Sequence, residues 1–133
     1  ELSGGKLLKA GTLVVNKRPL TYCGMSEGVL MVSFAQLCLC ARSAMDYTQL
    51  AREFHSILIS DVPQLTPDSE DGARRFVTLI DEFYDRNIKV AVAAEVEMNS
   101  LYAGRKLAFE FQRTLSRLIE MQSVAYLGRE HRP

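Results

Sequence analysis

The sequence contains no tryptophan, only four prolines and two histidines, and no excess of either charge. Its 16 Lys and Arg residues are matched by 16 Asp and Glu residues, so the formal net charge is zero. A nucleic-acid-binding protein normally carries a basic excess, and this balance therefore argues against nucleic acid as a partner. No apolar run approaches the roughly 20 residues that a membrane-spanning helix needs.

Motifs of self-contained enzymes are missing as well. The sequence has no G-x-x-x-x-G-K-S/T phosphate loop, no G-x-G-x-x-G, no G-x-S-x-G and no H-E-x-x-H. The chain alone is therefore not expected to be an active enzyme. Its N-terminus, ELSGGKLLKAG, has neither a Met nor a signal pattern, and we expect the chain to begin partway through a longer protein.

Cysteine is scarce. Cys23, Cys38 and Cys40 are odd in number and lie mostly among apolar residues, which predicts buried free thiols in a reducing compartment. Cys38 and Cys40 have a C-x-C spacing, but only His55 and His131 are available to complete a four-ligand zinc site. We therefore predict no metal site.

The apolar share of 47% is large enough for one domain with a real core. In the first part of the chain, β-rich runs at 11–15, 19–25 and 28–34 alternate with short polar turns and predict a β-meander. The apolar segment FAQLCLCA then leads into a helix with Ser43 as N-cap and Asp46 approximating a capping box. The apolar stripe of this helix consists of Tyr47, Leu50, Ala51 and Phe54.

A β-α-β unit follows. Strands at 56–62 and 88–96 flank a helix at 67–86, and parallel strands with a right-handed crossover are the default for such a unit. Thr66 is the expected N-cap of the helix and Asn87 its expected stop. The predicted buried face consists of Ala73, Phe76, Val77, Ile80 and Tyr84. Strand 88–96 is apolar nearly throughout, which is typical of a strand covered on both faces.

A long helix at 109–128 is predicted to close the chain and to stop near Gly128. Its predicted buried face consists of Phe111, Leu115, Leu118, Gln122 and Ala125. The fold class is therefore α/β. Residues 1–133 form a single domain in which the β-meander joins a small, partly parallel sheet flanked by helices.

Two carboxylates stand at predicted strand ends. Asp61 ends the strand 56–62, and Glu95 lies near the end of the strand 88–96. In open α/β sheets, ligands bind at the carboxyl ends of strands, where an Asp could hold magnesium or orient water. The simpler interpretation is that Asp61 caps the turn before Pro63 and that Glu95 faces solvent. Both interpretations stay open.

One pair of arginines, Arg74 and Arg75, lies in the first turns of the helix 67–86. Cations there oppose the helix dipole at a cost of about 0.3–1 kcal/mol each. Asp81 lies two turns after Arg74, and Glu82 lies two turns after Arg75, so a solvated and paired face is the simple interpretation. The sharper hypothesis is that one of these arginines projects across a subunit boundary toward a phosphate.

A second pair, Arg113 and Arg117, lies one helical turn apart in FEFQRTLSRLIEMQS, so both guanidiniums leave the same face. Glu110 precedes Arg113 by three residues, and Glu120 follows Arg117 by three. These local carboxylates are sufficient to offset the repulsion between the arginines. The pair by itself does not demand a phosphate.

Four segments resemble a known family. DYTQLAREFHSILISDVPQL, ARRFVTLIDEFYDRNIKVAVAAEV, LYAG and FEFQRTLSRLIEMQSVAYL follow one another in the order found in the C-terminal part of ZapE-like cell-division ATPases and their mitochondrial AFG-type relatives. The compact AEVEMNSLYAGRKLAFEF is similar to the bacterial branch. IDEFY at 80–84 looks like a Walker-B sequence, but it lies inside the helix predicted at 67–86, and that role is rejected.

The resemblance implies an AAA+-related P-loop ATPase of which this chain is the C-terminal region, with the phosphate loop and Walker B in an N-terminal ATPase core. It implies ATP and Mg²⁺ as cofactors of the complete protein and no cofactor for this chain alone. It also implies a cytoplasmic protein at the division site that acts on the tubulin-like division GTPase. A homo-oligomer and a peripheral association with the membrane stay open.

The same resemblance assigns candidate roles to the arginines. Arg113 and Arg117 are candidate nucleotide sensors, and Arg74 or Arg75 is the candidate trans-acting finger, because the planar guanidinium can hold phosphate oxygens bidentately. In the first hypothesis the chain is an accessory domain that supplies these arginines to a nucleotide bound by the core. In the alternative it is an interaction module that recruits a division or membrane partner, and every arginine is structural.

Overall fold

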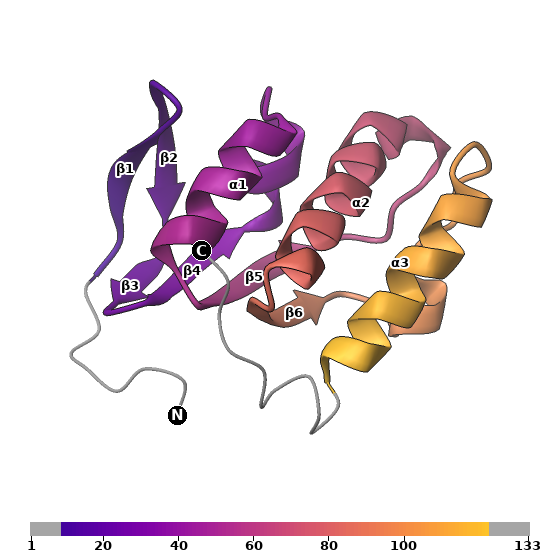
Figure 1. Cartoon of the computed structure of the whole chain (residues 1–133). Coiled ribbons are helices and arrows are strands. Elements are labelled where there is room, and N and C mark those ends of the chain that lie inside the picture. The colour runs from indigo at the N-terminus through magenta and orange to yellow at the C-terminus, as the bar shows by residue number, and fades with distance from the viewer. Residues whose placement is uncertain (1–8, 123–133) are drawn as a thin grey trace.

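The computed structural model describes residues 9–122, in which strands and helices follow each other closely (Figure 1). The strands are β1 (Gly11–Val15), β2 (Arg18–Tyr22), β3 (Gly24–Ser26), β4 (Val29–Ser33), β5 (Ser56–Val62) and β6 (Lys89–Ala94). The α-helices are α1 (Ala44–Glu53), α2 (Glu70–Asp85) and α3 (Ala108–Met121), and the short helical turns are η1 (Ala35–Leu39), η2 (Pro67–Ser69) and η3 (Met98–Ser100). The predicted α/β class is confirmed. The stop predicted at Gly128 lies outside the described residues, as does Ala125.

The predicted meander is present as two successive hairpins, which the structure divides between two sheets. β1 and β2 pair antiparallel as a separate two-stranded sheet. Their turn residues, Asn16 and Lys17, have φ values of 51° and 69°, as a tight hairpin turn with a matching twist requires. The chain passes from one sheet to the other at Cys23. The N–H of Cys23 donates to the Met31 carbonyl at 2.7 Å, and β3 then pairs with β4.

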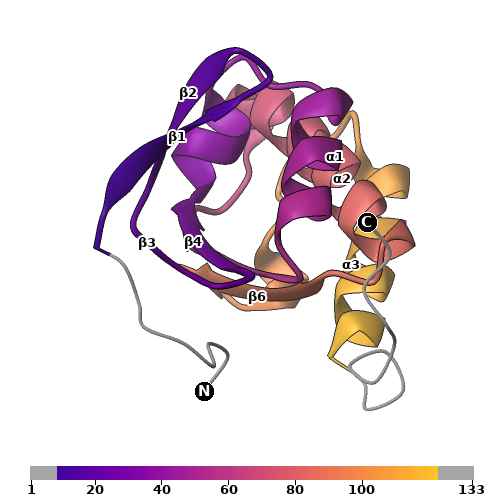
Figure 2. The same cartoon turned by 60° about the vertical axis from the view of Figure 1, so that its left-hand side comes forward.

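The main sheet has the order β3-β4-β5-β6. β5 and β6 are parallel, which confirms the predicted β-α-β unit. β4 and β5 are parallel as well, so α1 connects a second such unit that the sequence analysis did not identify. Because both crossovers proceed in the same direction across the sheet, their helices fall on the same face. Figures 1 and 2 show α1, α2 and α3 together on that side.

The core lies between this helical layer and the sheet. All four predicted stripe residues of α1 are buried, and the predicted α2 face is buried except for the half-buried Tyr84. In α3, Phe111 and Leu118 are buried as predicted, Leu115 is half-buried and Gln122 is exposed, while Thr114 and Met121 complete the buried face. A series of ring contacts joins Phe34, Phe76, Phe111 and Tyr102, with centroid distances of 5.8, 6.0 and 4.7 Å in that order. These rings hold η1, α2 and α3 together.

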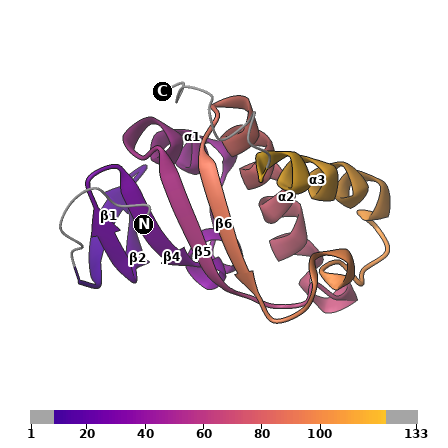
Figure 3. The same ribbon diagram turned by 90° about the horizontal axis from the view of Figure 1, so that it is seen from below.

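The opposite face of the sheet is not covered by any described element. Figure 3 shows β4, β5 and β6 in front of the helices. Ala91 and Ala93 of β6 are exposed on this face, and Leu58 of β5 is half-buried. The prediction that strand 88–96 is covered on both faces is therefore wrong for the described residues. The apolar sequence of the strand reflects one core face and one bare apolar face.

The helix predicted at 67–86 is present as the short turn η2, with Thr66 as its N-cap, followed directly by α2, which begins at Glu70 and ends at Asp85. Thr66 accepts a hydrogen bond from the N–H of Asp68 at 3.3 Å, and the Ser69 hydroxyl in turn accepts from the N–H of Thr66 at 2.9 Å. Asn87 follows the end of α2 with a φ of 56°. IDEFY at 80–84 lies within α2. Among residues 9–122, none of the helices combines the length and apolar character that a membrane crossing requires.

Asp46 attaches the β1–β2 hairpin to α1 through a buried ion-pair network. Its carboxylate accepts hydrogen bonds from Arg18 Nη2 on β2 at 3.1 and 3.2 Å and from Asn16 Nδ2 at 3.1 Å. The buried Arg42 guanidinium lies 3.6 Å away and donates to two backbone carbonyls, one in η1 and one in β2. The predicted capping box is absent: Ser43 is the N-cap but makes no side-chain bond, because Asp46 is committed to this network.

The Asp46→Ala substitution is expected to lower the free energy of unfolding by about 3–5 kcal/mol, because it leaves the buried Arg42 guanidinium without its carboxylate. Urea denaturation of the variant measures this loss. Asp85→Ala is the matched control, because Asp85 is exposed, and it should change stability by no more than about 0.5 kcal/mol. Equal effects of the two variants would contradict a central role for Asp46.

Candidate functional site

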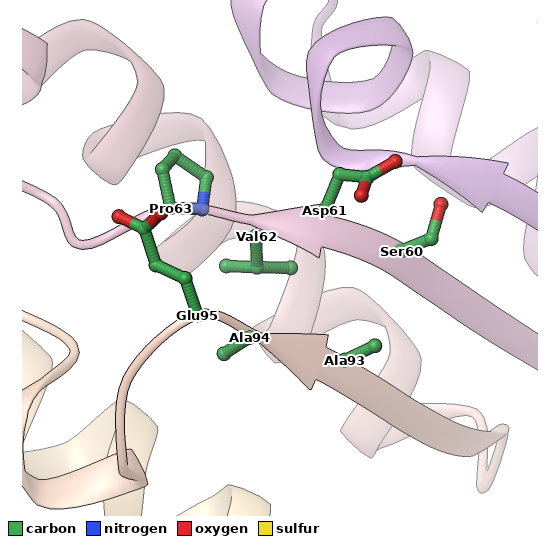
Figure 4. Close-up of a pocket in the computed structure, with 7 residues that line it drawn as sticks. All are labelled: Ser60, Asp61, Val62, Pro63, Ala93, Ala94 and Glu95. Atoms are coloured by element: carbon green, nitrogen blue, oxygen red, sulfur yellow. The ribbon is translucent and has the colours of Figure 1, made fainter.

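A pocket of about 340 Å³ lies at the carboxyl ends of β5 and β6 (Figure 4). Asp61 and Glu95 both line it, together with Ser60, Val62, Pro63, Ala93 and Ala94. The structure therefore brings the two predicted strand-end carboxylates to one crevice. This is the edge of an open α/β sheet at which ligands ordinarily bind.

The two carboxylates are not equivalent. Glu95 Oε1 accepts the backbone N–H of Gln64 at 2.8 Å, so Glu95 closes the turn that follows β5. Asp61 is exposed and adopts a φ of 55° at an irregularity in the β5–β6 pairing. Figure 4 shows the Glu95 carboxylate beside Pro63 and the Asp61 carboxylate pointing away from it. In the described part of the chain, no three His, Cys, Asp or Glu residues are grouped to hold a metal ion.

The three cysteines are free, as predicted, but only Cys38 is buried; Cys23 and Cys40 are exposed. Burial raises the pKa of Cys38 from 9.0 to about 12. The pKa of Tyr47 is also raised, first by burial and then by the neighbouring Cys38. Tyr47 donates its hydroxyl proton to the Leu37 carbonyl at 2.7 Å. Cys38 is therefore a protonated and chemically quiet core residue.

Stability is expected to fall as the pH rises above 9. The unfolded chain ionises Cys38 near pH 9 while the folded chain keeps the thiol protonated to about pH 12, so the unfolded state gains between these values. One such group changes the unfolding free energy by about 1.4 kcal/mol per pH unit. Urea denaturation between pH 7 and 10.5 measures the slope. Cys38→Ala should flatten it, whereas Cys40→Ala should leave it unchanged, and a flat profile for the unmodified chain would contradict the assignment.

The two arginines of the first pair, Arg74 and Arg75, have different surroundings. Arg75 is half-buried and donates from Nη1 to the Cys38 carbonyl at 3.0 Å, which ties α2 to η1. Arg74 is exposed, and its side chain has no partner among residues 9–122. The predicted pairs Arg74–Asp81 and Arg75–Glu82 are not formed in this part of the chain.

The acidic partners expected for the first pair are engaged elsewhere. Glu82 instead accepts from Thr48 at 3.0 Å and pairs with Arg86 at 3.4 Å. The Thr48 contact joins α2 to α1, and the Arg86 contact lies at the C-cap of α2. Asp81 faces α3.

The second arginine pair converges on Asp81. Arg117 Nη1 forms a direct ion pair and hydrogen bond with Asp81 Oδ1, and Arg113 Nη2 lies 4.0 Å from Asp81 Oδ2. The local carboxylates predicted as partners have other positions: Glu110 makes no ion pair with Arg113 in the described structure, and Glu120 accepts the Tyr84 hydroxyl at 2.8 Å. The anion between the arginines therefore comes from the neighbouring helix.

Asp81, Tyr84, Arg113 and Arg117 form what we call the α2–α3 arginine cluster. The Arg117 guanidinium lies 5.1 Å from the centre of the Tyr84 ring, in range of a cation–π interaction. The Arg113 side chain is 53% exposed and that of Arg117 is 26% exposed. Arg74 lies on the same face of α2 as Asp81, two turns earlier or about 10 Å along the helix axis. Sequence analysis did not identify Tyr84 or the shared role of Asp81, because both depend on how two helices pack.

The two arginines of the cluster are expected to differ in their contribution to folding. Arg117→Ala removes a partly buried ion pair and a ring contact and should lower the free energy of unfolding by about 1 kcal/mol. Arg113→Ala is the control and should change it by less than about 0.5 kcal/mol. Urea denaturation distinguishes the two. A larger loss for Arg113 than for Arg117 would contradict this geometry.

Comparison with known proteins identifies the family to which the chain belongs. The chain is a member of the AFG1-like ATPase family, whose family model matches residues 1–130. The resemblance that the motifs indicated is confirmed.

Particular relatives narrow the position within the family. The chain is 52% identical over 130 residues to cell division protein ZapE of Escherichia coli strain K12, a match that covers 98% of this chain and 35% of that protein. It is 31% identical to lactation elevated protein 1 homolog B of Danio rerio, over 86% of this chain and 29% of that protein. The chain thus spans about a third of the length of these relatives. No solved structure matches it.

Proposed function

We propose that residues 1–133 act as the C-terminal accessory domain of a larger P-loop ATPase and supply arginines to a nucleotide that the rest of that polypeptide binds. The observation that carries the proposal is the charge of the α2–α3 arginine cluster. One carboxylate, Asp81, serves two guanidiniums, and the exposed Arg74 lies on the same face of α2. Asp81 and Glu120, which accepts the Tyr84 hydroxyl, are the carboxylates bonded within this surface, against the three guanidiniums of Arg74, Arg113 and Arg117. Arg113 and Arg74 are thus the guanidiniums held least tightly here, and a guanidinium suits recognition of a phosphate.

The contacts favour particular roles. Arg113 is the better sensor, because it is more exposed and more loosely paired than Arg117. Arg74 is the better trans-acting finger, because Arg75 already holds the Cys38 carbonyl. ATP and Mg²⁺ would be bound by the rest of the ATPase and would supply the phosphoryl group and its charge compensation. The arginines of this chain would contact phosphate oxygens, and the chain alone would not hydrolyse ATP.

The cellular part of the proposal rests on the relatives. A bacterial relative at 52% identity is a cell division protein, so we assign this chain to an ATP-dependent step of division at the tubulin-like division GTPase. That assignment places it in the cytoplasm at the division site. A finger that acts in trans requires a homo-oligomer, and peripheral membrane association is compatible with it.

A second candidate function is supported by the outer face of α3. Phe109 is 78% exposed and Ile119 is 58% exposed, and both point away from the core. Exposed apolar side chains mark a contact surface where they gather into a patch, and these two lie at opposite ends of α3. In this alternative the chain recruits a division or membrane partner through α3, and the arginines only stabilise the fold.

Turnover of the complete ATPase distinguishes the two functions. Arg74→Ala is expected to reduce kcat by about 10³-fold or more if Arg74 is a finger, and Arg113→Ala should reduce turnover without loss of stability. Steady-state phosphate release measures the rates, and urea denaturation of the same variants measures stability.

Arg52→Ala is the matched control, because Arg52 is an exposed helical arginine on α1. Its turnover should equal that of the unmodified enzyme. Normal turnover of both Arg74→Ala and Arg113→Ala would overturn the accessory role. Loss of partner binding in Phe109→Ser, with normal turnover, would support the interaction module instead.

A further inference from the structure

The uncovered face of the main sheet, which we call the open face, is apolar over most of its centre. Lys89, at the start of β6, lies on the same side of the strand as Ala91 and Ala93. It contains a cavity of about 250 Å³ lined by Cys23, Met31, Leu58, Ile59, Ser60, Ala91, Val92 and Ala93. None of these side chains is charged. The open face lies across β4, β5 and β6, on the side of the sheet opposite to the helices (Figure 3).

Such a face is unusual for the strand arrangement of this sheet. Parallel strands occur almost only in sheets that are covered on both faces. Both faces of such a sheet are apolar, so a face without helices would expose apolar side chains to water. The three strands β4, β5 and β6 are mutually parallel. The described residues therefore supply two layers, helices and sheet, of an arrangement that ordinarily has three.

We infer that the open face is the docking surface for the remainder of the same polypeptide, which lays an apolar helical layer across β4, β5 and β6. This inference rests on the proposal that the chain belongs to a larger ATPase. The match to the Escherichia coli relative covers 98% of this chain but 35% of that protein, so most of a family polypeptide lies outside the match and is available as the third layer. Ala91 and Ala93 are small enough to let a helix approach β6 closely.

This placement has a consequence for the arginines. The α2–α3 arginine cluster belongs to the helical layer, on the other side of the sheet from the open face. A core that docks on the open face is separated from Arg74 by the sheet and by α2. Arg74 and Arg113 then both face outward, toward a neighbouring copy of the ATPase. The nucleotide that they reach is therefore the one bound by that neighbouring copy, which is the geometry of arginines that act in trans.

Cys23 provides a native reporter of the open face. Its thiol is exposed and lies 4.0 Å from the Ser60 hydroxyl within the cavity lining. Cys40 is also exposed but lies between η1 and α1, away from the open face, so it serves as an internal control. Maleimide alkylation without nucleotide, followed by peptide mass spectrometry, should label Cys23 at least about tenfold more slowly in the complete gene product than in the 133-residue chain. Cys40 should react at the same rate in both.

A charge on the open face tests the contact directly. Ala91 is exposed, so Ala91→Lys should leave the stability of the 133-residue chain unchanged. In the complete gene product it should restore fast labelling of Cys23 and lower the midpoint of urea denaturation. Met45→Lys, an equivalent change at an exposed apolar position on α1, is the matched control and should do neither.

Several outcomes would overturn the inference. Equal labelling of Cys23 in both proteins would show that the remainder does not cover the open face. If protection of Cys23 in the 133-residue chain grows with protein concentration, the open face is covered by a second copy. If that protection is lost on deletion of residues 1–8 or 123–133, the open face is covered by the chain's own ends. Labelling is independent of turnover. A protected Cys23 with normal turnover of both Arg74→Ala and Arg113→Ala refutes the proposed function alone. An unprotected Cys23 with reduced turnover of these variants refutes only the docking.

Discussion

The attachment of the β1–β2 hairpin depends on one buried carboxylate. Asp46 is fully buried, and its charge is tolerable only because Arg18, Arg42 and Asn16 surround it. The same Arg42 side chain donates to carbonyls of η1 and β2, so the network also fixes the irregular turn between β4 and α1. A buried ion pair adds little net stability compared with an apolar contact of the same size, but it allows one arrangement of its members. The hairpin therefore sits in a single position against α1, although it belongs to a different sheet.

The fold distributes its surfaces in a way that follows from strand direction. Two parallel crossovers in the same sense place every helix on one face, which leaves the other face bare and apolar. The helical layer carries the charged groups, and the carboxyl edge carries Asp61 and the hydrogen-bonded Glu95. In the proposed docking, the apolar face and the charged face of the domain would meet different neighbours.

Local physics made much of this fold predictable from sequence. The cap at Thr66, the stop at Asn87 and the helical periodicity of α2 depend on neighbours within one or two turns. The stop and the periodicity were predicted correctly, and Thr66 caps the turn η2 that leads into α2. The predictions that were wrong concern side chains whose contacts lie far away in the sequence. Asp46 fits a local capping box by spacing, yet it pairs with Arg18, and the arginines of α3 find Asp81 rather than the glutamates beside them. An apolar strand such as β6 looks the same in sequence whether the second face is covered by this chain or by another.

The ion pairs between arginine and carboxylate at Asp46 and at Asp81 differ in how easily they can be broken. Around Asp46, solvent is excluded, so separating Arg42 from the carboxylate would strand a charge in the core. Around Asp81, the Arg113 side chain is half in water, and ion pairs at that exposure are worth about 0–1 kcal/mol. A phosphate offers more charge and more acceptor oxygens than one carboxylate and could draw Arg113 away at little cost in stability. Arg117, held by Asp81 and the Tyr84 ring, would stay as the anchor. The exposure of the carboxylate, 0% for Asp46 and 33% for Asp81, therefore separates the arginine network that builds this fold from the pair that could exchange its partner.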